Sequence, residues 1–442
     1  MVRGPGPGPF ASYGRGMPRL PSSPAFWRSP VRGPWFTSVL GLVLLVGIGV
    51  LFVTGLLSYA AYNPGLAGVN DKTPGKGLLG LYLFAWPTRP VWLYRLTQGA
   101  HVTLGVTLVP VLLAKLWSVV PKLFALPPVR SLAHALERLS LLLLVGGGLF
   151  EFTTGILNIQ LDYVFPGSFY PLHFYGAWVF FAAFLAHAAL KTPAALRNLR
   201  DLRGEHRTQQ AQLPDPGQHA GAPRDELTSP EPGPPTVSRR GALGVVGGGS
   251  LLLFATTAGR GFDGPLRETA LLAPHGGPEP GAGPGAFQIN KTARVAGIDA
   301  RETAEENWRL VVEGRGGTVR LTRAELLRLP LHGAELPIAC VEGWSTSDQP
   351  WRGVRLRDLA ALVGHDPDHA PDVLVESLQR HGSFRRAALR ANQVRDPRSL
   401  LALFVGGAPL TPDHGYPARV IVPAAPGVLN TKWVARMTFG DL

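Results

Sequence analysis

Cysteine is almost absent from this chain, because Cys340 is the only one in 442 residues. A single thiol excludes an internal disulfide and any zinc site built from several cysteines. Charged residues are scarce at 17%, against 45% hydrophobic residues, and residues 1–35 contain no Asp or Glu. Since soluble domains average about 25% charged residues, this deficit favours membrane-spanning segments over one large soluble core.

The hydrophobic residues gather in long runs, and a bilayer-spanning helix takes about 20 apolar residues. Four runs cover residues 36–60, 100–120, a stretch from 134 or 140 to 157, and 172–190. A fifth, short and rich in glycine, covers 241–258, and a mixed soluble pattern follows. No internal repeat is evident. We predict a multidomain fold: an all-α transmembrane four-helix bundle, a fifth transmembrane helix, and a C-terminal α+β domain.

Composition shifts set the domain boundaries. Segments rich in Gly, Pro, Gln and Arg cannot bury a core and are typical of flexible chain. We predict a disordered basic tail at 1–35, a four-helix membrane domain at 36–192, a cytoplasmic flexible linker at 193–238, the fifth transmembrane helix at 239–260, a second flexible linker at 261–286 and the α+β domain at 287–442.

The net charge of +13 admits nucleic-acid binding, but the positions of the basic residues predict a membrane lipid partner and no nucleic acid. Basic residues occur in the tail, in the loop with Lys122 and Arg130, and at the start of the linker. In contrast, residues 158–171 have no Lys or Arg. The positive-inside rule then places the tail, that loop and the linker in the cytoplasm. The chain from about residue 260 onward is expected to be extracytoplasmic.

The string SRRG at 238–241 precedes the weakly hydrophobic fifth run. It resembles a twin-arginine export signal, here in the interior of the chain, which would carry an already folded domain outward. The alternative is that two arginines simply close a cytoplasmic linker. Both interpretations place the C-terminal domain outside.

Four histidines lie at positions of the predicted spans: His101, His134, His173 and His187. Residues 173 and 187 are 14 apart, so on one helix they lie within about 40° of the same face and about 21 Å apart. A separation of about 21 Å fits two planar, metal-containing cofactors at different depths in the membrane, whose hydrocarbon core is about 30 Å thick. By topology, His101 and His173 lie on the outer side of the membrane and the other two on the inner side.

Over residues 36–192 this arrangement resembles the four-helix di-haem cytochromes b of bacterial respiratory enzymes. We predict two haem b groups: an outer one held by His101 and His173, and an inner one held by His134 and His187. Bis-imidazole ligation suits electron transfer because it leaves no coordination site open. The alternative is a set of packing or interfacial histidines. Glu151, inside the third span, could take protons from a quinol or lie neutral near the interface.

Cys340 lies in the string IACVEGWSTSDQPWRGVRLRDL, within a region of alternating strand-like and helical stretches. This string, with the later HGYPAR and NTKW, resembles the molybdopterin domain of the sulfite oxidase family, including its bacterial methionine sulfoxide reductase type. The resemblance covers residues 287–442. It implies that Cys340 binds molybdenum through its thiolate, a soft donor, with molybdopterin as the cofactor. The alternative is a buried structural thiol.

The resemblance also implies a set of pterin-contacting residues. They are Ser377, His414, Arg419, Asn430, Thr431 and Lys432. Cationic and planar donors of this kind suit the phosphate of a pterin cofactor. One departure concerns the substrate: Glu342 and Asp348 lie near the cysteine, where sulfite oxidases carry arginines. Sulfite is therefore not the substrate that we expect.

Together these features predict a membrane-bound, molybdopterin-dependent oxidoreductase that moves an oxygen atom to or from a small extracytoplasmic substrate. The cofactor would supply the redox chemistry. The haems would exchange electrons with the quinone pool. Both directions of electron flow are open, with reduction of a sulfoxide-like substrate favoured. The alternative is a membrane cytochrome whose molybdopterin-like domain is degenerate and non-catalytic.

Overall fold

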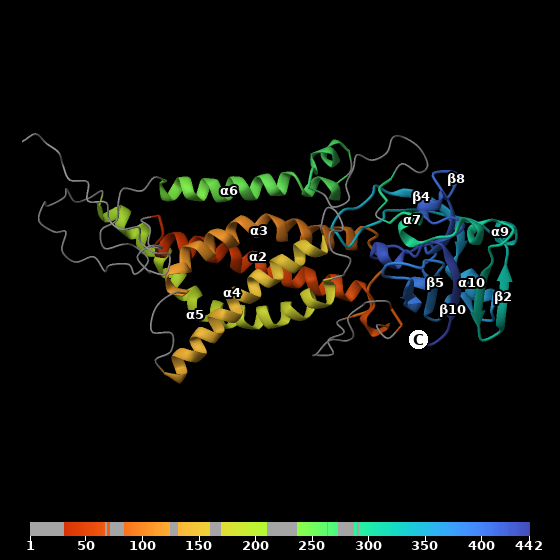
Figure 1. Ribbon diagram of the computed structural model, residues 1–442, viewed down its shortest axis with the longest axis horizontal. Coiled ribbons are helices and arrows are strands. Elements are labelled where there is room, and N and C mark those ends of the chain that lie inside the picture. The colour runs from red at the N-terminus through yellow and green to blue at the C-terminus, as the bar shows by residue number, and fades with distance from the viewer. Residues whose placement is uncertain are drawn as a thin grey trace, which may run out of the picture.

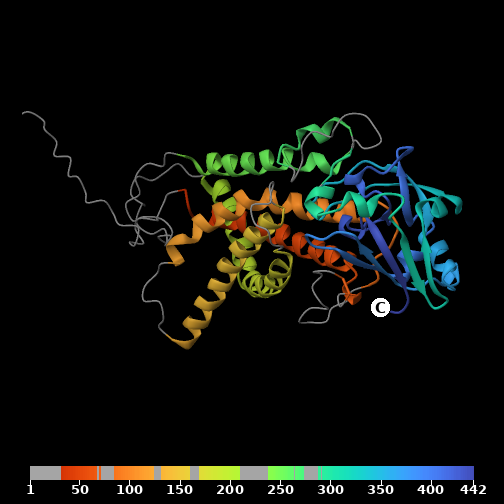
Figure 2. The same ribbon diagram turned by 45° about the vertical axis from the view of Figure 1, so that its right-hand side comes forward.

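A computed structural model of the chain describes residues 31–66, 69–70, 84–123, 131–159, 169–209, 237–262, 264–272, 287–289 and 291–442. Figure 1 shows an elongated molecule with long helices at one end and a strand-rich domain, which contains the C-terminus, at the other. Figure 2 shows the same two parts after a turn of 45°. Most of the predicted tail, and parts of both predicted linkers, lie outside the described residues.

The hydrophobic runs form five long helices. They are α2 (Pro34–Ala61), α3 (Leu93–Leu123), α4 (Leu132–Asn158), α5 (Tyr170–Gln209) and α6 (Arg239–Ala255). Each contributes a segment that is long and apolar enough to cross a membrane. Ser238 caps α6 by accepting a hydrogen bond from the backbone N–H of Gly241 at 3.0 Å. The described residues thus confirm five membrane-length helices.

The helices are arranged in pairs. Helix α2 packs along α3, α4 packs along α5, α2 also contacts α5, and α6 lies against α3. Leu44 of α2, Leu108 of α3 and Phe184 of α5 are among the buried residues of one shared core. Figure 1 shows that the N-terminal end of α4 diverges from the other helices.

Helix α5 is longer than the sequence predicts. It continues to Gln209, so residues 193–209 of the predicted flexible linker are helical. Leu196, Leu199 and Leu202 recur at a spacing of three residues, which helices favour. Asn198 donates a hydrogen bond from Nδ2 to Oγ of Ser38 on α2, at 3.2 Å. This contact ties the extension to the bundle.

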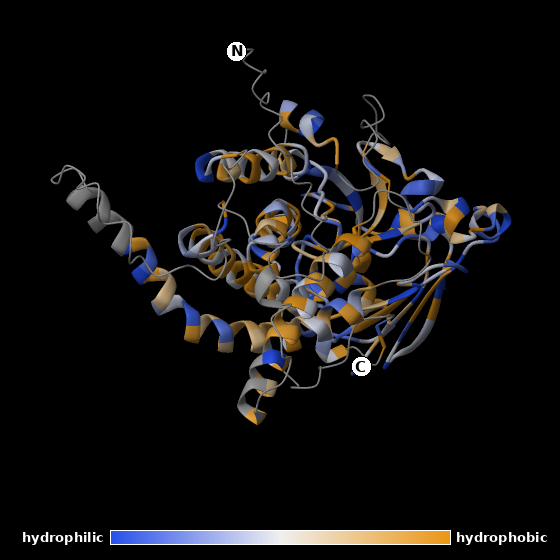
Figure 3. Ribbon diagram, turned by 60° about the vertical axis from the view of Figure 1, so that its left-hand side comes forward, coloured by the Kyte–Doolittle hydropathy of each residue, from blue (hydrophilic) through white to orange (hydrophobic). Residues whose placement is uncertain are grey.

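The outward faces of the helices are hydrophobic. Val46, Leu142, Val179 and Leu251 are each more than half exposed. Coloured by hydropathy, the long helices are mainly hydrophobic, whereas the strand-rich domain is mixed (Figure 3). Such outward apolar surface is what a lipid environment requires and what water disfavours.

Two five-stranded sheets form the C-terminal domain. The first has the order β2 (Gly317–Leu321), β1 (Leu310–Gly314), β10 (Val434–Phe439), β5 (Val373–Ser377), β6 (Arg386–Leu389), with β1 and β10 parallel and the other neighbours antiparallel. The second is antiparallel and has the order β3 (His332–Leu336), β4 (Gln349–Arg355), β7 (Leu400–Val405), β8 (Ala408–Pro409), with β9 (Arg419–Ile421) also paired to β7.

Short helices connect and cover these sheets. They are α7 (Ala293–Ala296), α8 (Ala300–Thr303), α9 (Arg323–Arg328), α10 (Leu356–Leu362) and α11 (Ala391–Arg395). Thr322 starts α9 with a reciprocal capping box to Glu325. Buried residues from both sheets and from α10 meet in one core. The chain passes from the second sheet to the first between β9 and β10, and the candidate site lies along this crossover.

Candidate functional site

Cys340 sits in a tight turn between β3 and β4. Its backbone N–H donates to the carbonyl of Trp344 at 2.8 Å, and its own carbonyl accepts from Gly343 at 3.1 Å. Gly343 has φ +89°, a conformation that disfavours a side chain. The indole N–H of Trp344 donates to Glu342 at 2.8 Å. The turn therefore holds the thiol, 3% exposed, at a fixed place in the interior.

A cavity of about 30 Å³ lies beside Cys340. Its lining residues are Gln288, Ile289, Ile338, Cys340, Trp344, His414, Arg419, Gly427 and Lys432. Four of the predicted site residues, namely Cys340, His414, Arg419 and Lys432, are thus brought together although up to 92 positions separate them in the chain. A cavity of this volume has room for about one water molecule, so a pterin would have to displace some of the side chains that converge on it.

The cavity wall concentrates positive charge. Burial lowers the pKa of Arg419 to about 9. Burial, together with repulsion from Arg419 and Lys291, lowers the pKa of Lys432 well below its usual range. Lys432 donates from Nζ to the carbonyls of Lys291 at 2.6 Å and Asp413 at 2.8 Å. Cations that are destabilised by their surroundings in this way would gain from an anionic ligand.

His414 is held as a neutral imidazole. Its Nε2 lies 3.3 Å from the carbonyl of Phe287, which can only accept, so Nε2 carries the hydrogen and Nδ1 accepts from Thr411 at 2.8 Å. Burial, followed by repulsion from Arg419, lowers the pKa of His414 to about 4. The ring therefore adds shape and hydrogen bonding to the site without adding a third charge.

Three buried polar atoms, one on Arg419 of the cavity wall and two on the residues that precede Lys432 in the chain, have no hydrogen-bond partner within the described part of the chain. They are Nε of Arg419, Nδ2 of Asn430 and Oγ1 of Thr431. Buried donors are nearly always satisfied in native proteins. A planar guanidinium with a spare donor, an amide N–H and a hydroxyl form a donor set that suits a phosphate group. The residues present therefore fit an anionic, phosphate-bearing cofactor.

The metal itself would need ligands from that cofactor. No group of three or more His, Cys, Asp or Glu side chains gathers anywhere among the described residues. Cys340 is thus the one protein donor that the cavity offers to a soft metal. This matches a metal held between a thiolate and a sulfur-rich organic cofactor.

Two neighbours of the cavity have supporting roles. Ser377 is not in the lining: its hydroxyl donates to the carbonyl of Lys432 at 2.7 Å and accepts from the N–H of Gln379. Its direct contact with the cofactor stays a prediction. Gly415 has φ +108°, and a Cβ there would lie 3.1 Å from Cβ of Lys432. Glycine is required because the turn that presents His414 and Arg419 runs against Lys432.

In the helical part, His101 and His173 come together. Their ring centroids are 6.2 Å apart and the rings are nearly perpendicular, at 83°. A carboxylate oxygen of Glu151 lies 3.2 Å from Nδ1 of His173. His187 lies further along α5, and His134 lies near the start of α4. The predicted pairing of those two histidines stays a prediction.

The contact between the helical part and the cysteine turn was not predicted from the sequence. Nε2 of Gln98, on α3, donates to the carbonyl of Val341, next to Cys340. Val102, one turn further along α3, abuts Gly343: a Cβ on that glycine would lie 2.6 Å from Cβ of Val102. His101 lies on the same helix between these two contacts. No motif marks Gln98 or Val102, so sequence alone could not have found them.

Further hydrogen bonds join the helical part to the strand-rich domain. Asn63 donates to the carbonyl of Ala388 at 3.1 Å and to Gln393 at 2.8 Å. The indole N–H of Trp86 donates to the carbonyl of Ala424 at 2.7 Å. Arg398 donates to the carbonyl of Thr88 at 3.1 Å. Buried polar bonds of this kind set one docking geometry, since leaving either partner unsatisfied is costly.

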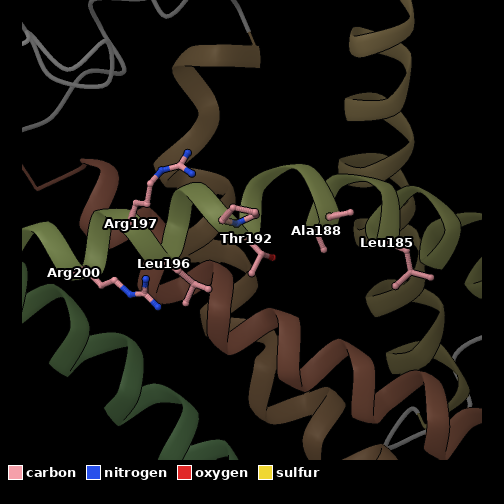
Figure 4. Close-up of a pocket in the computed structure, with 8 residues that line it drawn as sticks. Leu185, Ala188, Thr192, Leu196, Arg197 and Arg200 are labelled. Atoms are coloured by element: carbon pink, nitrogen blue, oxygen red, sulfur yellow. The ribbon is translucent and has the colours of Figure 1, made fainter.

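A second hollow lies along α5, away from Cys340. Figure 4 shows the side chains of Leu185, Ala188, Thr192, Leu196, Arg197 and Arg200 along it. None of these residues is a predicted cofactor contact. The apolar side chains followed by two arginines fit the end of a membrane span.

Residues 297–441 match the family model described as the oxidoreductase molybdopterin binding domain. Mitochondrial sulfite oxidase of Drosophila melanogaster is 30% identical over 158 residues, which cover 31% of this chain and 28% of that protein. The uncharacterized oxidoreductase YuiH of Bacillus subtilis is 30% identical over 133 residues, which cover 30% of this chain and 65% of that protein.

Among solved structures, the sulfane dehydrogenase SoxCD of Paracoccus pantotrophus is 25% identical, with a TM-score of 0.28, over 31% of this chain and 39% of that one. The chain spans less than a third of the length of the sulfite oxidases that it matches. The C-terminal region is an oxidoreductase molybdopterin-binding domain of the sulfite oxidase type, and the predicted class of this domain is confirmed.

Proposed function

We propose that this protein is a membrane-bound oxidoreductase that moves an oxygen atom to or from a small extracytoplasmic substrate at a molybdopterin centre. Electrons would pass between that centre and the quinone pool through b-type haem in the helical part. The observation that carries the proposal is the direct contact between the Cys340 turn and the helix that bears His101.

Each group in the cavity has a definite task in this function. The thiol of Cys340 would anchor the metal, while Arg419 and Lys432 of the lining, with their neighbours Asn430 and Thr431, would hold the anionic part of the cofactor. The cofactor, when bound, supplies the two-electron oxygen-transfer chemistry. Neutral His414, whose Nε2 donates to the carbonyl of Phe287, would form part of the wall without adding charge. The indole of Trp344 closes one wall of the cavity.

The route for electrons consists of a few covalent bonds and one hydrogen bond. From Cys340 it runs one residue to Val341, across the hydrogen bond to Gln98, and along one turn of α3 to His101. Three residues of α-helix advance about 4.5 Å. This geometry supports His101 and His173 as the haem ligands nearest to the molybdenum centre.

We also propose membrane lipid and quinone as partners of the helical part. The arginines of the hollow along α5, Arg197 and Arg200, follow the apolar residues of the span (Figure 4). They would lie among cytoplasmic headgroups under the positive-inside rule. With α5 entering at that side, the Cys340 turn at the opposite end of the helices would face the extracytoplasmic space.

The test is a reoxidation assay. Membranes that contain the protein are reduced chemically, excess reductant is removed, and candidate sulfoxides and N-oxides are added while the b-type absorbance is followed. Rapid haem reoxidation by at least one such substrate is expected. Membranes from cells starved of molybdate serve as the control and should stay reduced. A b-type spectrum that no oxygen-atom acceptor or donor perturbs, in molybdenum-replete protein, would overturn the proposal.

The docking contact gives a separate prediction. Val102→Trp should overpack the contact with Gly343 by about 1–3 kcal/mol, which corresponds to about a 5–160-fold loss of the docked arrangement. Electron transfer between substrate and haem should slow by at least about fivefold, while haem and molybdenum contents stay unchanged. Stopped-flow spectroscopy measures the rate. Leu113→Trp, on an exposed face of α3, is the matched control, and equal rates in both variants would contradict the route.

A further inference from the structure

The membrane helices contain an internal repeat that the sequence analysis did not find. Residues 47–57 and 147–157 align without gaps and share five of eleven residues. The shared positions are Gly47 and Gly147, Phe52 and Phe152, Thr54 and Thr154, Gly55 and Gly155, and Leu57 and Leu157. The first segment lies on α2, which packs along α3, and the second on α4, which packs along α5. The bundle thus contains one helix pair twice.

Both copies hold a histidine in the same way. Oγ1 of Thr54 lies 3.0 Å from Nδ1 of His101, and Oγ1 of Thr154 lies 3.0 Å from Nδ1 of His173. Each threonine hydroxyl also donates to the carbonyl four residues earlier, at 2.8 Å. It must therefore accept from Nδ1–H, which leaves the lone pair on Nε2. That is the tautomer in which an imidazole binds a metal through Nε2.

The glycine after each threonine lies equally close to the histidine in both copies. A Cβ at Gly55 would lie 3.3 Å from Cε1 of His101, and a Cβ at Gly155 would lie 3.3 Å from Cε1 of His173. Further along, Gly47 faces Leu108 and Gly147 faces Phe180, each seven residues beyond the histidine of its pair. The repeat is therefore one of three-dimensional contacts as well as of sequence.

The separation of the two rings suits one metal between them. Two metal–nitrogen bonds of about 2.0–2.1 Å, with roughly 1.1 Å from each nitrogen to its ring centre, give about 6.3 Å between the centres. The observed centroid separation is 6.2 Å. The centroid separation of His101 and His173 thus suits one metal bound by both imidazoles, with one ligand from each copy.

The two copies differ at the depth of the predicted inner haem, which is called the inner level. Fourteen residues after His173 comes His187, but fourteen residues after His101 comes Lys115, within the related strings LAH and LAK. Nζ of Lys115 donates to the carbonyl of Thr37 at 2.6 Å. A protonated ammonium has no lone pair to offer to iron. Only one copy can therefore supply an axial ligand at this depth.

His134 is at the wrong depth to replace the missing ligand. Helices α4 and α5 are antiparallel, with Thr154 opposite His173 and Gly147 opposite Phe180. That register places His187 opposite residue 140, six residues from His134, or about 9 Å along the axis. The leucines of this part of α4, including Leu132 and Leu136, are exposed, in keeping with the divergence of the helix in Figures 1 and 2.

We infer that the membrane domain binds a single haem, held between the two copies by His101 and His173, and that the inner level carries none. The inference rests on the proposed function for the presence of haem. It replaces the two-haem arrangement that the sequence predicts. All electrons between quinone and molybdenum would then cross one haem, adjacent to the Cys340 turn.

Haem stoichiometry tests the inference. The full-length protein is purified in detergent, and haem is measured by the pyridine haemochrome method against protein and molybdenum contents. One haem per chain is expected. His187→Ala and His134→Ala should retain it with an unchanged low-spin spectrum. His101→Gly and His173→Gly should lose the low-spin signal, and added imidazole should restore it, which separates ligand loss from misfolding.

The possible failures are distinguishable. Two haems per chain, one of them lost in His187→Ala, would overturn the single-haem inference and leave the proposed function intact. Protein with a full complement of molybdenum and no haem would overturn both the inference and the electron route of the proposed function. A low-spin spectrum that survives in His101→Gly without imidazole would exclude this histidine as the ligand.

Discussion

Replacing Cys340 with serine is expected to abolish substrate turnover while the b-type spectrum stays unchanged. The thiol is 3% exposed and lies in the cavity with His414, Arg419 and Lys432. A thiolate is a soft donor, whereas a serine hydroxyl is a hard one that stays protonated near neutral pH. Outer-shell partners of metal ligands typically contribute 10–100-fold to affinity or activity, so loss of the ligand itself should cost at least about 100-fold.

The experiment separates chemistry from folding. Serine is close in size to cysteine, so the turn made by the hydrogen bonds of Cys340 to Trp344 and Gly343 should persist. Turnover is measured with the substrate found by haem reoxidation, and haem content is measured on the same sample. Ser347→Ala, in the same loop but outside the cavity, is the control and should remain active. Full activity in Cys340→Ser would remove the thiol from the mechanism.

The sequence predicted the helices well because their signal is local. Residues 36–60 contain no charge, and the structure has α2 at Pro34–Ala61. A run of apolar residues that must cross a bilayer can satisfy its backbone only as a helix. In the C-terminal domain, which the sequence predicts to be α+β, the structure has strands such as β1, which ends at Gly314, and helices such as α10, which begins at Leu356.

The cavity was predicted by motif and not by periodicity. Cys340, His414, Arg419 and Lys432 come from three separate strings, and the sequence contains nothing local that shows them to be neighbours. Two sheets bring them together, with β9 in one and β10 in the other. Only the resemblance to a family in which these strings meet made that prediction possible.

The features that the sequence did not predict are contacts between segments that lie far apart in the chain. Thr54 and Thr154 read as ordinary residues of apolar runs, and their role emerges only when each faces a histidine on the next helix. Five identities in eleven residues are easily overlooked among hydrophobic runs of similar composition. The contact of Gln98 with Val341 is equally invisible, because a polar residue at the end of a span is expected at any membrane interface.

Replacing Arg419 with alanine is expected to reduce the molybdenum and pterin contents by about 10–100-fold. A planar guanidinium can make two hydrogen bonds to one phosphate, and the loss of one such bond to a charged group, about 1.5–3 kcal/mol, already corresponds to about 10–100-fold in affinity. Arg419 is 4% exposed, donates to the carbonyl of His414 at 3.4 Å, and lies 5.5 Å from the ring centre of Trp351. Arg419→Lys keeps the charge but not the planar donors, so an intermediate content is expected.

The stability of the cofactor-free protein distinguishes binding from folding in this variant. Burial lowers the pKa of Arg419 to about 9 because the charged form is poorly solvated there. Removing the cation removes this penalty, whereas the cavity left by the side chain and the lost hydrogen bond to the carbonyl of His414 destabilise the fold. We therefore expect a small net change in the thermal unfolding midpoint of the cofactor-free protein, even as cofactor content falls. Molybdenum is measured by mass spectrometry and the pterin by fluorescence after oxidation. Arg320→Ala, at an exposed position of β2, is the control. A full cofactor content in Arg419→Ala would show that the cofactor's anionic group is bound elsewhere in the domain.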